Sequence, residues 1–112
     1  NLSGVFHCFS GDLNQANRVI NLNGFYLGIG GIVTFKNSNL DTILKDIDLK
    51  HIILETDSPY LSPHPFRGKR NEPKNILTIA EKISIIKTCD ILKVAEITTY
   101  NCNKLFSLKL ET

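Results

Sequence analysis

The sequence predicts an α/β fold in which parallel strands alternate with helices. Three short apolar runs, at residues 2–6, 25–29 and 52–54, have the length of buried strands. Stretches with apolar residues at helical spacing separate these runs, and two more such stretches follow the last one. Strands that alternate with helices favour βαβ units, in which neighbouring strands run parallel.

Residues 12–23 predict the first helix. Its apolar residues share one helical face: Leu13, Ala16, Val19 and Ile20. Asp12 can cap the helix, and Gln15 follows three residues later, as in a capping box. Asn23-Gly24 is a typical helix end.

The remaining helices are expected on both sides of a long loop. A turn at residues 37–39 precedes a short helix marked by Leu40, Ile43, Leu44 and Ile47. Residues 58–74 hold all four prolines and predict a loop. Asn75 is expected to cap a helix with an apolar face made of Ile76, Ile79, Ala80, Ile83 and Ile86. A last helix, at about residues 93–106, places Val94, Ile97, Asn101 and Leu105 on one side.

Composition limits the possible classes of protein. The 112 residues make at most one domain, or part of one, and the net charge of +2 is too small to argue for nucleic-acid binding by itself. No apolar run approaches the roughly 20 residues of a membrane helix, so we expect no membrane partner. Three widely spaced cysteines favour a reducing compartment, here the cytoplasm. The chain begins at Asn1 and contains no Met, so we expect a processed or truncated chain.

Polar residues and glycines follow each predicted strand. His7 closes the first strand, Gly30-Gly31 the second, and Glu55 with Asp57 the third. Ligands of parallel α/β folds bind beyond the carboxyl ends of the strands, so these positions form a candidate site. The two glycines would let a substrate approach the backbone closely.

Two interpretations stay open for each charged residue at the strand ends. His7 is either a core histidine or a metal ligand or acid/base group. Glu55 and Asp57 alternate along a strand, so both should point to one side, where a shared divalent metal ion would relieve their repulsion. Asp57 could instead cap the turn into Ser58-Pro59. Cys8 should point away from His7 and pack.

The loop after the third strand is basic and stiff. Residues 67–74 contain four basic residues and one acid. Pro63, Pro65 and Pro73 limit the flexibility of the loop. Arg67, Lys69 and Arg70 are candidates for binding phosphate, since arginine suits bidentate phosphate contacts, although a solvated basic loop has the same composition. Asn71 and Glu72 are expected to lock the loop rather than to touch substrate.

Five motifs resemble the TatD family of metal-dependent deoxyribonucleases. They are "HCFSG" at residues 7–11, "YLGIGG" at 26–31, "ILETDSPYL" at 53–61, "RGKRNEP" at 67–73 and "NCNKLF" at 101–106. The resemblance covers essentially the whole chain. It implies a TIM barrel of the amidohydrolase kind and hydrolysis of DNA phosphodiester bonds with one or two divalent ions, Mg²⁺ or alternatively Zn²⁺ or Mn²⁺.

The resemblance also implies roles for individual residues. By position, His7 matches a metal-binding histidine, and Asp57 matches an aspartate that binds metal and takes part in catalysis. Glu55 lies in the motif, but the family's metal-binding carboxylate lies upstream, so we expect Glu55 to support a neighbour.

The resemblance implies that this chain is the C-terminal part of a single barrel domain, about three of eight βα units. A whole barrel needs about 250 residues. The amino-terminal half, which would bring an HxH pair, a glutamate and another histidine, is not in this chain. We therefore expect the chain alone to be inactive, and its open edges to be covered by that half or by self-association.

Two alternative functions remain at this point. One is a metal-dependent amidohydrolase with a small substrate on the same scaffold. The other is a non-catalytic fragment that binds anions or associates with itself.

Overall fold

Three parallel strands and four helices make up the part of the chain that the computed structural model describes, residues 2–35 and 37–107. In chain order the elements are β1 (Gly4–Phe6), α1 (Leu13–Ile20), β2 (Phe25–Ile29), α2 (Leu40–Leu44), β3 (Ile52–Leu54), α3 (Ile76–Lys87) and α4 (Ile91–Phe106). A short 3-10 turn follows β2 at Gly31–Thr34. Two others precede β3 at Leu49–His51 and α3 at Pro73–Asn75.

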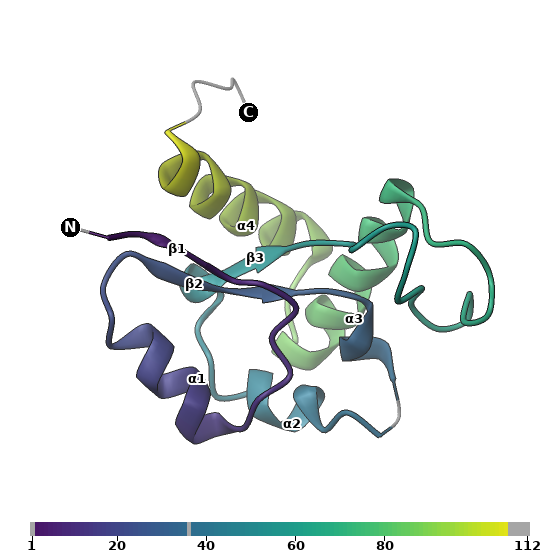
Figure 1. Ribbon diagram of the computed structural model, residues 1–112, viewed down its shortest axis with the longest axis horizontal. Coiled ribbons are helices and arrows are strands. Elements are labelled where there is room, and N and C mark those ends of the chain that lie inside the picture. The colour runs from purple at the N-terminus through teal and green to yellow at the C-terminus, as the bar shows by residue number, and fades with distance from the viewer. Residues whose placement is uncertain (1, 36, 108–112) are drawn as a thin grey trace.

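The strands form one sheet in the order β1-β2-β3, and both pairings are parallel. Gly4 pairs with Phe25 and Leu27 with Ile52, so the strands keep their sequence order across the sheet. In Figure 1, α1 and α2 lie below the strands and α4 above them, and the loop after β3 extends to one side. The prediction of parallel strands that alternate with helices is therefore confirmed.

The capping box predicted for the first helix is present. The Asp12 carboxylate accepts the Gln15 backbone N–H at 2.8 Å, and the Gln15 side-chain oxygen accepts the Asp12 N–H at 2.9 Å. The helix ends at Ile20, before the predicted end near Asn23. Gly24, with φ of +91°, then turns the chain into β2.

Two other helix starts differ in detail from the prediction. Asn75 occupies the N-cap position of α3, as expected, but its side chain does not cap the helix, because its amide donates to the Asn71 side chain at 3.0 Å. The last helix begins at Ile91 rather than Lys93, because the Asp90 carboxylate accepts the Leu92 N–H at 2.9 Å and caps the helix earlier.

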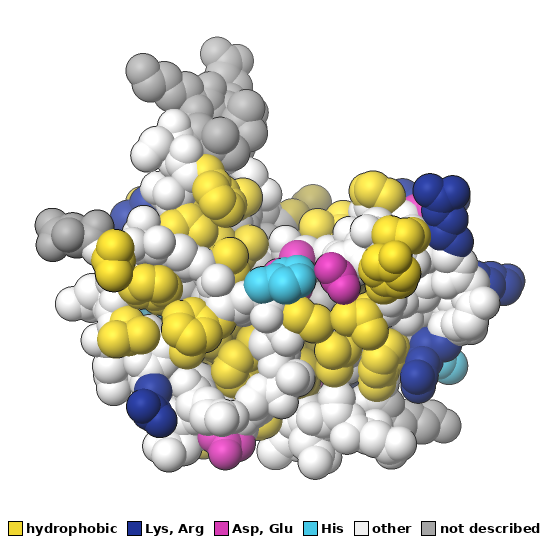
Figure 2. Space-filling view, in the orientation of Figure 1, with side chains coloured by type: hydrophobic (Ala, Val, Ile, Leu, Met, Phe, Trp, Pro, Cys, Tyr) yellow, Lys and Arg dark blue, Asp and Glu magenta, His cyan; other side chains and the backbone are white. Residues whose placement is uncertain are grey.

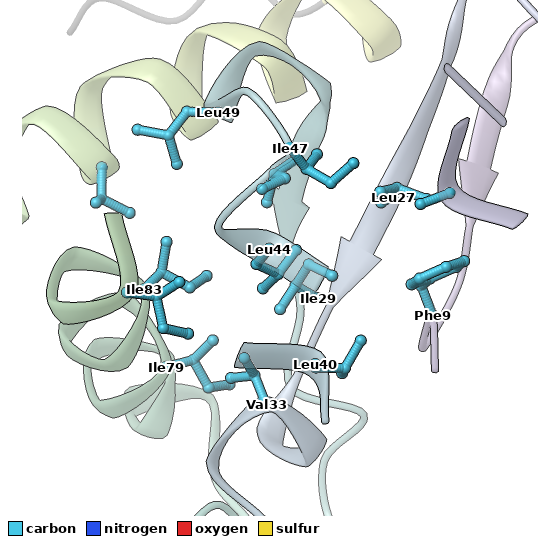
Figure 3. Close-up of a cluster of buried hydrophobic side chains, with 14 of the residues drawn as sticks. Phe9, Leu27, Ile29, Val33, Leu40, Leu44, Ile47, Leu49, Ile79 and Ile83 are labelled. Carbon is cyan, nitrogen blue, oxygen red and sulfur yellow. The ribbon is translucent and has the colours of Figure 1, made fainter. Parts of the chain in front are cut away.

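A single apolar cluster joins the strands to all four helices. Leu27, Ile29 and Ile52 contribute from the strands, and α3 contributes Ile79 and Ile83. Figure 3 shows the cluster extending from Phe9 across Ile29 and Leu44 to Ile83, with these side chains pointing toward one another. Alternate residues of β2, such as Gly28, face away from this cluster, which leaves the other face of the sheet for the candidate site.

Polar groups fasten two helices to the sheet. The Asn101 side-chain amide, on α4, donates to the carbonyls of Leu49 and Ile52 at 2.9 and 2.8 Å. The Lys87 ammonium, at the end of α3, donates to three carbonyl groups at the end of α2 and just beyond it, those of Leu44, Lys45 and Ile47. No helix in residues 2–35 or 37–107 is long and apolar enough to cross a membrane.

Candidate metal-binding site

His7 lies in a turn directly after β1. His7 and Cys8 leave the strand, and Cys8 has a left-handed backbone with φ of 53°. The chain then returns to β2, where the Phe9 N–H donates to the Gly28 carbonyl at 2.9 Å. The expected strand alternation of His7 and Cys8 is therefore wrong, because neither residue is in a strand. The turn leaves the His7 side chain 59% exposed above the carboxyl end of the sheet.

Glu55 holds this turn from the end of β3. Its Oε1 atom lies 2.9 Å from His7 Nδ1 and accepts the Cys8 backbone N–H at 2.6 Å. The Glu55 side chain is only 16% exposed, because it lies over Gly28 of the neighbouring strand. A Cβ atom at residue 28 would overlap the Glu55 carboxylate, so glycine makes the room for this contact. Glu55 thus lies where the sequence predicted a supporting residue, beside the imidazole.

Asp57 reaches the same histidine from the opposite side of the ring. Its Oδ1 atom lies 3.4 Å from His7 Nε2, and its backbone is left-handed with φ of 55°. Because β3 ends at Leu54, strand alternation does not set the direction of Asp57, and that part of the prediction is wrong. Instead of facing each other, Glu55 and Asp57 flank the imidazole of His7.

The two carboxylates change the acid–base properties of the turn. The hydrogen bond to Glu55 and the charge of Glu55 raise the pKa of His7, and Asp57 adds to this effect. Burial raises the pKa of the Cys8 thiol, and the two negative charges raise it further. Cys8 is thus a neutral thiol beside the site, as expected for a packing residue rather than a nucleophile.

The donor atoms fit a divalent metal ion. The bond from Nδ1–H to Glu55 leaves the Nε2 lone pair of neutral His7 directed toward Asp57, and metal-binding histidines commonly donate their other ring N–H to a carboxylate. His7 Nε2 and Asp57 Oδ1 lie 3.4 Å apart, so the two atoms would both be able to bind one ion. Within the described residues no group of three or more His, Cys, Asp or Glu side chains could hold a metal, so the candidate ligands His7 and Asp57 do not make a metal site by themselves.

A buried asparagine fixes the turn that carries Asp57. The Asn71 side chain is 1% exposed, and its amide donates to the Thr56 carbonyl and, at 2.6 Å, to the Tyr60 carbonyl. These two carbonyls lie on either side of Asp57 in the chain. Asn75 in turn donates to Asn71 Oδ1. The structure thus places Asn71 as a clamp on the turn, in line with the predicted locking role.

The predicted phosphate-binding residues do not converge on His7. The Arg67 guanidinium lies 4.2 Å above the Phe35 ring, and Arg67 and Lys69 line one hollow. Arg70 lines a different hollow, together with Glu72. Figure 2 shows histidine and acidic side chains near the centre of this face, separated by hydrophobic side chains from the basic side chains at its edge.

Glu72 and Gly31 contact other residues of this chain. Glu72 is exposed and pairs with Lys74 at 3.2 Å. A Cβ atom at Gly31 would overlap the Leu61 carbonyl, so this glycine admits the loop after β3 and not a substrate. The expectation that Gly30-Gly31 opens the backbone to substrate is therefore wrong for Gly31, because the chain itself fills that space.

Sequence reasoning missed three residues around the site: Gly28, Phe35 and Tyr60. Gly28 had a usable signal, since it lies inside the predicted strand at 25–29, two residues before the Gly30-Gly31 pair. Phe35 and Tyr60 had none, because their positions depend on how the loop after β3 folds back against the turn after β2.

Comparison with known proteins identifies the family. Residues 1–107 match the model of the family described as TatD related DNase. An uncharacterized metal-dependent hydrolase of Buchnera aphidicola from Acyrthosiphon pisum is 48% identical over 94% of this chain and 40% of its own length. The uncharacterized metal-dependent hydrolase YabD of Bacillus subtilis is 43% identical over 96% of this chain and 42% of its own length.

Solved structures of TatD proteins match the fold of this chain. The TatD homolog YJJV of Escherichia coli matches with a TM-score of 0.87 and 30% identity over 93% of this chain and 40% of that protein. A TatD family hydrolase of Entamoeba histolytica matches in fold with a TM-score of 0.81 at 24% identity, over 93% of this chain and 42% of that protein. The chain thus spans about two fifths of the length of these relatives, and the prediction that its fold is part of a TIM barrel is confirmed.

The match of the family model to nearly the whole chain, together with these relatives, shows that the chain belongs to the TatD related DNase family.

Proposed function

We propose that this chain is the C-terminal part of a metal-dependent hydrolase that cleaves phosphodiester bonds in DNA. The observation that carries the proposal is the arrangement of His7 Nε2 and Asp57 Oδ1, 3.4 Å apart, with the other ring nitrogen of His7 bonded to Glu55. The description of the family as related to a DNase supports DNA as the substrate.

Each of the three residues has a distinct role in this proposal. A bound divalent cation, Mg²⁺ or alternatively Zn²⁺ or Mn²⁺, in one or two copies, supplies Lewis acidity that withdraws charge from the phosphate oxygens. His7 and Asp57 are ligands. Asp57 also orients the attacking water and accepts its proton, because its carboxylate lies at the open carboxyl end of the sheet. Glu55 keeps the His7 proton on Nδ1 and so keeps Nε2 free.

The rest of the site comes from a further part of the barrel. Two ligand side chains do not complete a metal site, and a barrel of this kind needs about 250 residues. In the described part of the chain, β1 pairs only with β2, and Phe6 at the end of β1 is 43% exposed. A hollow of about 750 Å³ lined by His7, Val19 and Leu22 opens next to this strand. We propose that the amino-terminal half covers this edge and that the isolated chain is inactive.

We propose the cytoplasm as the compartment of this protein. Cys8, Cys89 and Cys102 are all free, which supports a reducing compartment, the cytoplasm.

The test uses the full-length gene product that carries this sequence. We expect it to cleave labelled DNA oligonucleotides only when a divalent metal is present, and EDTA to stop the reaction. An Asp57→Ala substitution should slow cleavage by about 10²- to 10⁴-fold, the range lost with a catalytic acid/base group. Asp46→Ala is the matched control, because Asp46 is an exposed aspartate away from the site. Full activity in the Asp57→Ala variant would refute the assigned role.

A substrate panel tests the reaction class separately. DNA and RNA oligonucleotides, amides and lactones are offered to the same enzyme at equal concentrations. Cleavage of amides or lactones without cleavage of oligonucleotides would replace the proposed function with that of a small-substrate amidohydrolase.

A further inference from the structure

Tyr60 presents an exposed aromatic ring three residues after Asp57. Tyr60 is 71% exposed, yet its backbone N–H and its backbone carbonyl both form hydrogen bonds. The Tyr60 N–H donates to the Asp57 carbonyl at 2.9 Å, and the Tyr60 carbonyl accepts from the buried Asn71 amide at 2.6 Å. The ring therefore projects into solvent from a fixed point beside the candidate metal-binding site.

Tyr60 forms one wall of a hollow of about 330 Å³, which we call the loop groove. The residues of the loop groove that the argument uses are Phe35, Pro59, Tyr60, Arg67 and Lys69. Its volume is at the lower end of the about 300–1,000 Å³ typical of ligand pockets. The groove thus combines aromatic surface with two positive charges, and Tyr60 in its wall follows Asp57 by three residues in the chain.

The cations of the loop groove are available to a ligand. Stacking on Phe35 at 4.2 Å holds the plane of the Arg67 guanidinium while its N–H groups remain free to donate. In residues 2–35 and 37–107, no carboxylate forms an ion pair with Arg67 or Lys69, whereas Lys74 of the same loop pairs with Glu72. A guanidinium held in one plane without an acidic partner is suited to a phosphate group.

We propose that the loop groove binds one nucleotide of the substrate strand. The nucleobase stacks on the ring of Tyr60, and the phosphate beside it is bound by Arg67 and Lys69. Aromatic rings that stack on bases, combined with cations that follow the backbone, are the usual means of binding an unpaired strand. The inference rests on the proposed function, because it assigns part of that substrate to a place next to Asp57.

Binding is measured apart from cleavage, so that the two proposals fail separately. The probe is a fluorescein-labelled single-stranded DNA oligonucleotide, and the protein is the full-length gene product with Asp57→Asn, which keeps the probe intact. Fluorescence anisotropy gives the dissociation constant. Tyr60→Ala should weaken binding by about 5- to 100-fold, the loss expected for one stacking aromatic.

Two further variants separate stacking from loop structure. Tyr60→Phe keeps the ring and should bind as the parent does. Tyr100→Ala removes a second exposed tyrosine, 63% exposed on α4, and should leave binding unchanged. Equal weakening by Tyr60→Phe and Tyr60→Ala would overturn the proposal, because the aromatic ring would then not be the binding element.

Abasic probes test the base directly. A set of oligonucleotides carries one abasic position each, moved along the strand. At one position the loss caused by Tyr60→Ala should disappear, because no base remains to stack. A loss that stays equal for every abasic probe would overturn the stacking assignment.

The cations are tested by salt dependence. Arg67→Ala and Lys69→Ala combined should reduce the slope of log K against log salt by about 0.7, the value for one phosphate contact on a single strand. Lys74→Ala removes the same charge from the same loop and should change the slope less. An unchanged slope for Arg67→Ala and Lys69→Ala combined would remove the phosphate from the proposal.

Cleavage by the unmodified enzyme decides which proposal fails. If the enzyme cleaves DNA and Tyr60→Ala binds normally, the loop groove is refuted and the proposed function stands. If the enzyme neither binds nor cleaves any oligonucleotide, the proposed function fails and the loop groove fails with it.

Discussion

A buried asparagine side chain forms hydrogen bonds to backbone carbonyls at each end of β3, but the two asparagines fix different parts of the molecule. Asn101 is 3% exposed and donates to the carbonyls of Leu49 and Ile52 at the beginning of the strand. Asn71 is 1% exposed and donates to the carbonyls of Thr56 and Tyr60 beyond its end. Each is a buried amide that satisfies two backbone oxygens, and neither carries charge.

The difference lies in what each asparagine fixes. Asn101 attaches α4 to the beginning of β3, at the opposite end of the strand from Glu55. Asn71 fixes a turn in which Asp57 has a left-handed backbone, a conformation that costs energy and persists only when its surroundings impose it. In barrels of this kind the amino ends of the strands contribute stability, while the carboxyl ends carry the chemistry. The same hydrogen bonds therefore serve stability at one end of β3 and site geometry at the other.

The largest expected effect is on stability, at the amino end. Asn101→Ala removes two buried hydrogen bonds, while the Leu49 carbonyl still accepts the Ile52 N–H, and should lower the free energy of unfolding by about 1–3 kcal/mol, at about 0.5–1.5 kcal/mol for each bond. Urea unfolding of the full-length protein measures the change. Asn103→Ala on the same helix is the control, since the Asn103 side chain forms no hydrogen bond within residues 2–35 and 37–107. The rate of DNA cleavage per folded molecule should stay near that of the parent. A large loss of this rate would contradict the proposal that the amino end of β3 serves stability and the carboxyl end serves the site.

At the carboxyl end we expect a loss of activity as well. Asn71→Ala should reduce metal affinity or cleavage rate per folded molecule by about 10- to 100-fold, as expected when a group that orients a metal ligand is removed. Metal titration under conditions where the variant is fully folded separates this effect from unfolding. If Asn71→Ala loses only stability, as Asn101→Ala does, the two ends of β3 are equivalent and the comparison fails.

The features predicted correctly from the sequence are those that local residue patterns specify. The strands, the parallel order and the capping box at Asp12 follow from local patterns that depend on few neighbours. The meeting of His7 with Glu55 and Asp57 was expected at one edge of the sheet because parallel strands bring their carboxyl ends together.

The details of the site depend on contacts between distant segments, which no local pattern records. The left-handed turn at Asp57 replaced the expected strand alternation because Asn71, fourteen residues later, holds the carbonyls around it. Asn75 was expected to cap a helix, but its amide bonds to Asn71 instead. The stacking of Arg67 on Phe35 likewise joins two loops whose relative position follows from packing alone.

A smaller effect should follow from one added methyl group at the carboxyl end. Gly28→Ala places a Cβ atom where the Glu55 carboxylate lies. Because that carboxylate is the end of a flexible side chain, it should move away from His7 with little change in stability. We expect the cleavage rate to fall by about 10-fold, through the loss of the bond that orients His7. In a Glu55→Gln background, Gly28→Ala should add little, and additive losses would show that Gly28 acts through another contact.

The smallest expected effect is a change in one titration. Glu55 raises the pKa of His7 above its ordinary value of 6.5, so metal-free Glu55→Gln protein should show a lower His7 titration midpoint than the parent. The raised pKa also means that the ionised His7 adds stability that is complete below pH 6.5 and is lost as the pH rises through the folded-state value. NMR of the histidine rings in EDTA measures both midpoints. His51, whose pKa is lowered mainly by burial, is an internal control that should not move. Equal His7 midpoints in the two proteins would mean that Glu55 does not orient the imidazole in solution, and the carboxyl end of β3 would then lack the contact that distinguishes it from the amino end.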